Sequence, residues 1–165
     1  MKPITQRLRA ERKQFIVSNE PTDILVVEDN EGERVSIVAA LQQAIPDVQV
    51  YSVHDGTEAL DFLFARGAYT DRVDESPPTL VLLDLAMPGD NGFAVLGQIR
   101  SLERQDSLTL TPVVMFTDSQ DNSDIKESYR CGANSYIIKP VNFPDFRAAV
   151  EKIGQYWMTY NQTST

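Results

Sequence analysis

The chain has 165 residues, 42% of them hydrophobic, which is long and apolar enough for one globular domain. Its formal net charge of −9 argues against direct DNA binding, because nucleic-acid binding normally uses lysine and arginine to displace counterions from phosphates. No apolar run approaches the roughly 18 residues that cross a bilayer or resembles a signal peptide, so we expect a cytoplasmic protein without a membrane segment.

The first 22 residues differ from the rest in charge. Their basic side chains outnumber the acidic ones, and three apolar residues keep to one face at helical spacing: Ile4, Leu8 and Phe15. This pattern predicts a basic, helical N-terminal arm over residues 1–22. A domain over residues 23–158 and a short polar tail over residues 159–165 would follow.

From residue 24 onward, short apolar runs alternate with segments of helical period, which is typical of successive βα units. We expect strands at 24–27, 48–53, 80–83, 113–116 and 135–138, and helices at 31–44, 57–65, 91–103, 121–130 and 143–158. Helical spacing also predicts the buried faces of the first two helices: Val35, Val38, Leu41 and Ile45 in the first, and Ala59, Leu60, Leu63 and Phe64 in the second.

These elements predict an α/β fold. Right-handed crossovers leave few arrangements, and the favoured one is a flavodoxin-like, doubly wound parallel sheet of five strands in the order 2-1-3-4-5 with five helices. In such a sheet the carboxyl ends of the strands meet at one edge, and the strand order reverses between strands one and three. A ligand site is expected at that point.

Acidic side chains follow strands one and three at this edge. Glu28 and Asp29 end the first strand and Asp84 ends the third. Two unit charges about 4 Å apart repel by roughly 4 kcal/mol at an effective dielectric of 20, so this group requires a cation. Oxygen-only ligands favour Mg²⁺ over zinc. Alternatively, the first two acids are solvated loop residues.

Asp84 is a candidate nucleophile, since a carboxylate can accept a phosphoryl group as an aspartyl phosphate. Lys139, after strand five, could pair with a phosphoryl oxygen, and Thr117, after strand four, could donate a hydrogen bond to another. The competing interpretations are a turn residue for Asp84, a surface lysine and an ordinary strand threonine.

These motifs, in this order, resemble those of the receiver domains of two-component response regulators. The resemblance covers residues 23–158 and rests on Glu28-Asp29, Asp84, Thr117, Tyr136 and Lys139-Pro140. Shorter strings resemble the single-domain regulators paired with bacterial phytochrome histidine kinases: Tyr69, Ser128-Tyr129, the segment 133–136 and the segment 155–157.

The resemblance implies a function. Mg²⁺ would be held by Asp29, Asp84 and the backbone carbonyl of Ala86, with Glu28 acting through water. Asp84 would take a phosphoryl group from a sensor histidine kinase, and Thr117 and Tyr136 would switch the surface formed by the helix at 121–130, the strand at 135–138 and the helix at 143–158. The protein would not be an enzyme beyond its own phosphotransfer and dephosphorylation. The Lys139-Pro140 bond would be cis.

The chain departs from the family pattern at Asp118, where a small residue is usual. A degenerate receiver that acts by protein contact without phosphorylation is therefore the alternative. An aspartate-dependent phosphatase would need an acid at Ala86, and an FMN carrier would need a phosphate cradle where Glu28 and Asp29 stand. The basic arm and the phytochrome resemblance together predict a homodimer through the switch surface, reinforced by the arm.

Overall fold

The computed structural model describes residues 22–103 and 106–163. Its centre is a five-stranded parallel sheet in the order β2-β1-β3-β4-β5, which confirms the predicted topology. The strands are β1 (Ile24–Val27), β2 (Val50–Val53), β3 (Leu80–Leu83), β4 (Val113–Thr117) and β5 (Ser135–Ile138). In the register, Val27 pairs with Val53 on one side and Leu83 on the other, so the first three strands end level.

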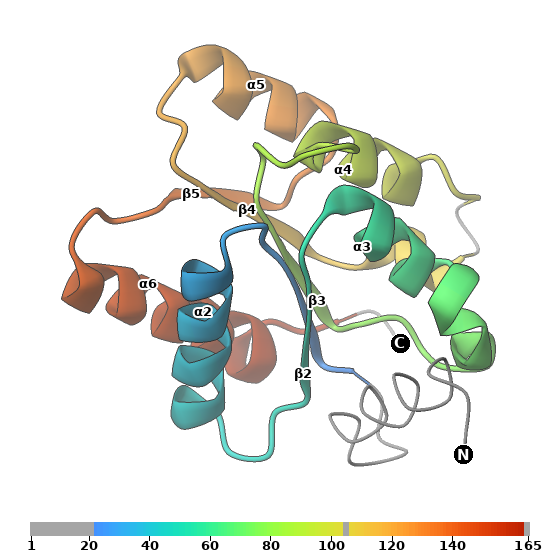
Figure 1. Ribbon diagram of the computed structural model, residues 1–165, viewed down its shortest axis with the longest axis horizontal. Helices are drawn as coiled ribbons and strands as arrows, with labels where there is room; N and C mark the ends of the chain where they lie inside the picture. Colours follow the sequence, from blue (N-terminus) through green and yellow to red (C-terminus); the bar gives the residue numbers. More distant parts are fainter. Residues whose placement is uncertain (1–21, 104–105, 164–165) are drawn as a thin grey trace, which may run out of the picture.

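Helices cover both faces of this sheet. They are α2 (Glu31–Ala44), α3 (Gly56–Leu63), α4 (Gly92–Arg100), α5 (Asn122–Arg130) and α6 (Phe143–Gln155), with a π-helical turn η3 (Tyr156–Tyr160) continuing α6 beyond its expected end. Figure 1 shows α2 and α6 on one face and α3, α4 and α5 on the other. Two short 3₁₀ helices, η1 (Gly67–Arg72) and η2 (Ser107–Leu110), lie in the connections.

Asparagine and aspartate start most of these helices. The side chains of Asn30, Asp55, Asn91 and Asn142 each accept a hydrogen bond from the backbone N–H three residues later. Such caps satisfy N–H groups that have no partner inside the helix. All four of these helices, α2, α3, α4 and α6, follow strand ends at the carboxyl edge of the sheet, so their caps help to set the loops around it.

The core has one apolar layer on each face of the sheet. β1, β3 and β4 are buried along their whole length, as expected for strands covered on both faces. One layer contains residues of α3 and α4, including Leu60 and Leu96, and the other contains residues of α2 and α6, including Leu41 and Val150. The sheet is therefore a rigid base for the groups at its edge.

The predicted buried face of α2 is wrong in part. Leu41 is buried, but Val35 is 61% exposed, and Ile37 and Ala40 are buried in its place. The reason is the close approach of α6, where a Cβ on Gly154 would lie 2.7 Å from Leu41 Cδ2. Packing against α6 turns α2 away from the face that its apolar spacing indicated.

The face of α3 differs from the prediction as well. Ala59 and Leu60 are buried as expected, and Leu63 and Phe64 pack against the core but are only partly buried. Phe62, which was not predicted to face inward, is 2% exposed. Phe62 stacks on Tyr51 of β2 with ring centroids 4.7 Å apart, and the guanidinium of Arg72 covers its ring. Contacts with β2 and η1 therefore make Phe62 the most deeply buried aromatic residue of α3.

Two further predictions concern the Lys139-Pro140 bond and the N-terminal arm. The Lys139-Pro140 peptide bond is trans, not cis. The trans form is the intrinsically favoured one, also before proline. The helical arm predicted over residues 1–22 lies, except for its last residue, outside the described part of the chain. Within that part, no helix is both long and apolar enough to cross a membrane.

Candidate functional site: an acidic edge of the sheet

The structure brings the predicted site residues together at the carboxyl edge of the sheet. Glu28 and Asp84 extend β1 and β3 by one residue, and their N–H groups donate to Val53 and Val27 carbonyls at 3.1 and 3.0 Å. Thr117 is the last residue of β4, and Lys139 follows β5 directly. Because the carboxyl ends of parallel strands lie at one edge, side chains from four strand ends converge there.

Three of these side chains form an acidic cluster. One carboxylate oxygen each of Glu28, Asp29 and Asp84 lies within 4.8 Å of the others. Glu28 and Asp84 are 1% and 7% exposed, whereas Asp29 is exposed. An all-oxygen ligand set of this size, open to solvent on one side, fits a hard divalent cation such as Mg²⁺. Ala86, two residues after Asp84, is also exposed beside it.

Lys139 bridges the acids from the protein side. Its ammonium donates to Glu28 Oε2 at 2.7 Å and to Glu33 Oε2 at 2.5 Å, and it lies 3.4 Å from Asp84 Oδ2. The lysine side chain is only 2% exposed. Burial acts to lower its pKa, but the hydrogen bonds to Glu28 and Glu33 and the charge of Asp84 raise the pKa overall, so the ammonium stays charged.

The buried carboxylates respond in the opposite way to burial. Burial raises the pKa of Glu28 to about 7, against the hydrogen bond from Lys139, and it also raises the pKa of Asp84. Glu28 is held at both oxygens, since Oε1 accepts from the Asn30 N–H at 3.0 Å. In Asp84, Oδ1 accepts from the Leu85 N–H at 2.8 Å. Both groups have fixed positions before any ligand arrives.

Close packing also fixes the backbone around Asp84. A Cβ on Gly92, the first residue of α4, would lie 2.6 Å from the Asp84 carbonyl oxygen. A Cβ on Gly56 would lie 1.8 Å from the Asp90 carbonyl oxygen, and Thr57 Oγ1 donates to the Asp90 side chain at 3.1 Å. The loop after Asp84 is therefore held between the starts of α3 and α4.

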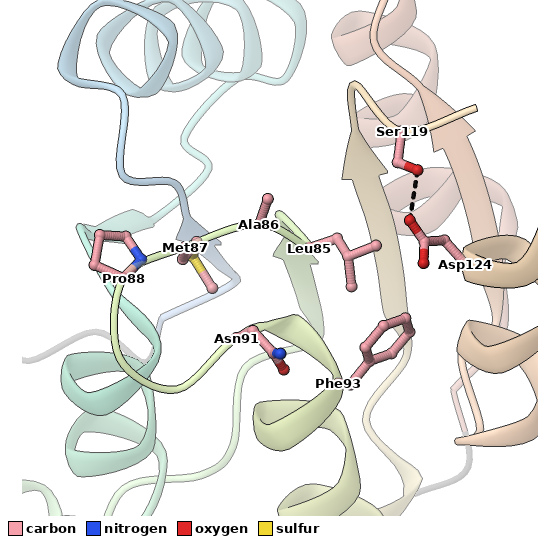
Figure 2. A pocket seen from close by; sticks show the side chains of 8 residues that line it. All are labelled: Leu85, Ala86, Met87, Pro88, Asn91, Phe93, Ser119 and Asp124. Atoms are coloured by element: carbon pink, nitrogen blue, oxygen red, sulfur yellow. Dashed lines mark hydrogen bonds between the residues drawn. The ribbon is translucent and has the colours of Figure 1, made fainter. Parts of the chain in front are cut away.

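Ser119 connects the two predicted switch residues. Its N–H donates to Thr117 Oγ1 at 3.3 Å, and its carbonyl accepts a hydrogen bond from the Tyr136 hydroxyl at 2.9 Å. Its own hydroxyl donates to Asp124 Oδ2, in the first turn of α5, at 2.6 Å. Figure 2 shows this bond at one side of an open groove of about 550 Å³, with Leu85, Ala86 and Met87 opposite. A movement of Thr117 would thus be felt at α5 and β5.

Two other positions bear on the sequence interpretation. The side chain of Asp118 is exposed, so the unusual carboxylate lies toward solvent. Glu33, in contrast, was not predicted to belong to the site, although it contacts Lys139. The available signal was its place in the first turn of the helix that follows Glu28 and Asp29, three residues after the Asn30 cap.

Comparison with known proteins agrees with this geometry. The family model of the response regulator receiver domain matches residues 24–151. The probable methanogenesis regulatory protein FilR2 of Methanothrix harundinacea is 36% identical over 88% of this chain and 90% of its own length. The response regulator Rcp1 of Synechocystis sp. is 33% identical over 86% of this chain and 92% of its own length.

Solved structures give the same result. The phosphorylated cyanobacterial phytochrome response regulator RcpA matches with a TM-score of 0.80 and 32% identity, covering 88% of this chain and 100% of that one. The Mn²⁺-bound form of Rcp1 matches with a TM-score of 0.78 and 30% identity over the same shares. With the fold, the site and these relatives in agreement, the chain belongs to the response regulator receiver domain family and is similar to phytochrome-associated response regulators.

Proposed function

We propose that this protein accepts a phosphoryl group on Asp84 from a phosphohistidine of a sensor kinase and passes the signal on through its surface. The observation that carries the proposal is the position of Asp84. Its carboxylate is fixed by the Leu85 N–H, lies 3.4 Å from the Lys139 ammonium, and stands beside the exposed Asp29 at the open edge of the sheet.

In the proposed step an oxygen of Asp84 attacks phosphorus, and the bond between phosphorus and the kinase imidazole nitrogen breaks. The electron pair returns to that nitrogen, which leaves as neutral imidazole after protonation. Little covalent chemistry is required of the protein, so positioning and charge neutralisation dominate. Lys139 would pair with one phosphoryl oxygen and Thr117 would donate to another. The protein would act on its own phosphoryl group only, in transfer and in hydrolysis.

The proposal includes a bound Mg²⁺. Asp29, Asp84 and the Ala86 carbonyl would hold it, with Glu28 acting through water, and the ion would neutralise the negative charge that gathers during transfer. The acidic cluster within 4.8 Å and the Mn²⁺-bound form of the relative Rcp1 support this part of the proposal. Mn²⁺ prefers the same oxygen ligands as Mg²⁺.

The proposed output surface is formed by α5, β5 and α6. Phosphorylation would draw Thr117 toward the phosphoryl oxygens, and the Ser119 connection would carry that movement to Tyr136 and to the start of α5. Apolar side chains are exposed on this surface: Tyr129, Ile138, Val141 and Phe143. They suit a homodimer interface, to which the basic arm of residues 1–22 would add contacts with an acidic partner subunit.

The phytochrome relatives support a bacterial phytochrome as the kinase. We also propose that the protein acts in the cytoplasm, without direct contact to DNA or membrane. The alternative, a receiver that works without phosphorylation, depended on Asp118. Its exposed side chain gives that alternative no support.

Phosphoryl uptake can be tested by intact-mass measurement with acetyl phosphate and Mg²⁺. We expect one added phosphoryl group on the full chain, none without divalent cation and none in Asp84→Asn. Asp90→Asn is the matched control, since Asp90 lies in the same loop but bonds to Thr57 instead of facing Lys139. Undiminished uptake by Asp84→Asn would place the acceptor elsewhere.

The dimer can be tested by light scattering across a concentration series. A chain that begins at Pro21 should dissociate at higher concentration than the full chain if the arm bridges two subunits. Identical dissociation of the two would remove the arm from the interface, and a monomer at every concentration would refute the dimer itself.

A further inference from the structure

Glu33 contacts the site lysine without belonging to the acceptor or cation groups. An ammonium has three protons to donate, and Lys139 directs them to three carboxylates, on Glu28, Glu33 and Asp84. The bond to Glu33 is 2.5 Å long, whereas the distance to Asp84 is 3.4 Å. In this structure the lysine is therefore held more closely by Glu33 than by the candidate phosphoryl acceptor.

The three carboxylates differ in how easily they can leave. The side chains of Glu28 and Asp84 are 2% and 8% exposed, so the contact that each makes with Lys139 could not readily be replaced by water. Glu33 is 33% exposed, and a rotation of its side chain would place its carboxylate in water. A water-exposed partner gives up an ion pair at low cost, because solvent replaces the lost contact.

The backbone at Glu33 would not need to move. Its N–H is bound to Asn30 Oδ1 at 2.9 Å, within the first turn of α2, and Arg34 donates to the Glu28 carbonyl at 2.9 Å. Only the side chain of Glu33 connects this turn to Lys139. The contact can therefore break without disturbing the helix or the acidic cluster.

We propose that Glu33 is a positioning residue whose carboxylate occupies one proton of the Lys139 ammonium until an oxygen of an arriving phosphoryl group displaces that carboxylate. This inference rests on the proposed function. Glu33 competes with the phosphoryl oxygens for one lysine proton, and its own charge repels an incoming anion. Both effects weaken the binding of an anion at the site, so the resting site resists small phosphoryl donors and anions. Removing the contact makes the lysine available.

The test uses three variants of the full chain. Glu33→Gln keeps the shape of the side chain and removes its charge. Glu33→Asp keeps the charge but shortens the side chain, which breaks the contact. Glu31→Gln is the matched control, because Glu31 is an exposed acid in the same first turn of α2, so its loss changes net charge and helix-end charge equally.

Two readouts are needed, both at saturating Mg²⁺. The first is the affinity for beryllium fluoride, a phosphoryl mimic, measured by calorimetry, where no phosphorus bond is broken. The second is the initial rate of phosphoryl uptake from acetyl phosphate, measured by intact mass. We expect Glu33→Gln and Glu33→Asp to bind the mimic about fivefold more tightly and to take up phosphoryl faster by a similar factor, with Glu31→Gln within about twofold of wild type.

The outcomes separate this inference from the proposed function. Wild-type protein that neither binds the mimic nor takes up a phosphoryl group overturns both. Normal wild-type uptake with unchanged Glu33 variants overturns only the role of Glu33. Weaker binding in Glu33→Gln would mean that Glu33 orients the lysine productively, and an equal gain in Glu31→Gln would mean that overall charge is responsible. Either result overturns the contact mechanism.

Discussion

Two glycines of α4 provide a sharp test of how tightly the acceptor loop is packed. A Cβ on Gly92 would lie 2.6 Å from the Asp84 carbonyl oxygen, 2.9 Å from Leu85 Cα and 3.0 Å from Met115 Cε. A Cβ on Gly97 would meet nothing within 4 Å. Glycine-to-alanine substitutions at these two positions therefore compare a closely packed site with an open one on the same helix.

The two environments predict opposite changes in the free energy of unfolding. At Gly97, alanine should raise the free energy of unfolding by about 0.5–1 kcal/mol, because it reduces the conformational freedom of the unfolded chain. At Gly92, two of the three close atoms belong to backbone, and the Gly92 N–H is bound to the Leu85 carbonyl at 2.9 Å, so the clash cannot be relieved by a side-chain rotation. Overpacking of this kind costs about 1–3 kcal/mol.

Urea unfolding followed by circular dichroism measures both values. The full chain with Gly92→Ala should unfold at lower urea than wild type and the chain with Gly97→Ala at slightly higher urea, with a difference of about 1.5–4 kcal/mol between the variants. Gly92→Ala should also slow phosphoryl uptake, since the forced shift occurs at the Asp84 backbone. Equal stability of the two variants would refute the packing argument at Asp84.

Three further predictions concern charge. Because folding raises the pKa of Glu28 from 4.5 to about 7, its contribution to stability is complete below pH 4.5 and is lost as the pH rises through 7. Without Mg²⁺, the free energy of unfolding of wild type, measured in urea, should fall by about 3 kcal/mol relative to that of Glu28→Gln between pH 4.5 and 7. Mg²⁺ should stabilise wild type more at the upper end of this pH range, because it binds ionised carboxylates. A difference between the two proteins that does not change with pH would contradict the burial effect. Asp118→Ala should change phosphoryl uptake from acetyl phosphate less than about twofold at fixed Mg²⁺, and a larger change would mean that this exposed carboxylate reaches the acceptor. Arg100→Met should lower the free energy of unfolding by about 2–4 kcal/mol, since the guanidinium donates to the carbonyls of Gly132, Thr109 and Thr111. Arg130 is exposed, so Arg130→Met should lower it by less than about 0.5 kcal/mol. Similar losses for the two variants in thermal unfolding would argue against the Arg100 network.

Much of the fold could be predicted because its signals are local. The apolar runs that form β1 and β3 have the predicted bounds, and α2 starts and ends where predicted. Parallel strands must bring their carboxyl ends to one edge, so the gathering of Glu28, Asp84 and Lys139 follows from strand order alone. The residues of the site were predictable for this reason.

Contacts between helices and between distant segments could not be predicted in the same way. Apolar spacing favoured Val35 for the core of α2, but packing against α6 exposes it and buries Ile37. Neither helix contains the information that decides this, because the rotation of α2 depends on where Gly154 allows α6 to approach.

The sequence by itself determined the order of the strands and which strand ends carry the acids, the threonine and the lysine, because the hydrophobic period and the handedness of crossovers are properties of short segments. The tertiary structure alone decided that Glu33 shares the ammonium of Lys139, 106 residues away. It also decided that Gly92 is closely packed, whereas Gly97 has open space beside it. These are distances between atoms of separate elements, and they arise only when α2, α4 and β5 are placed on the common sheet.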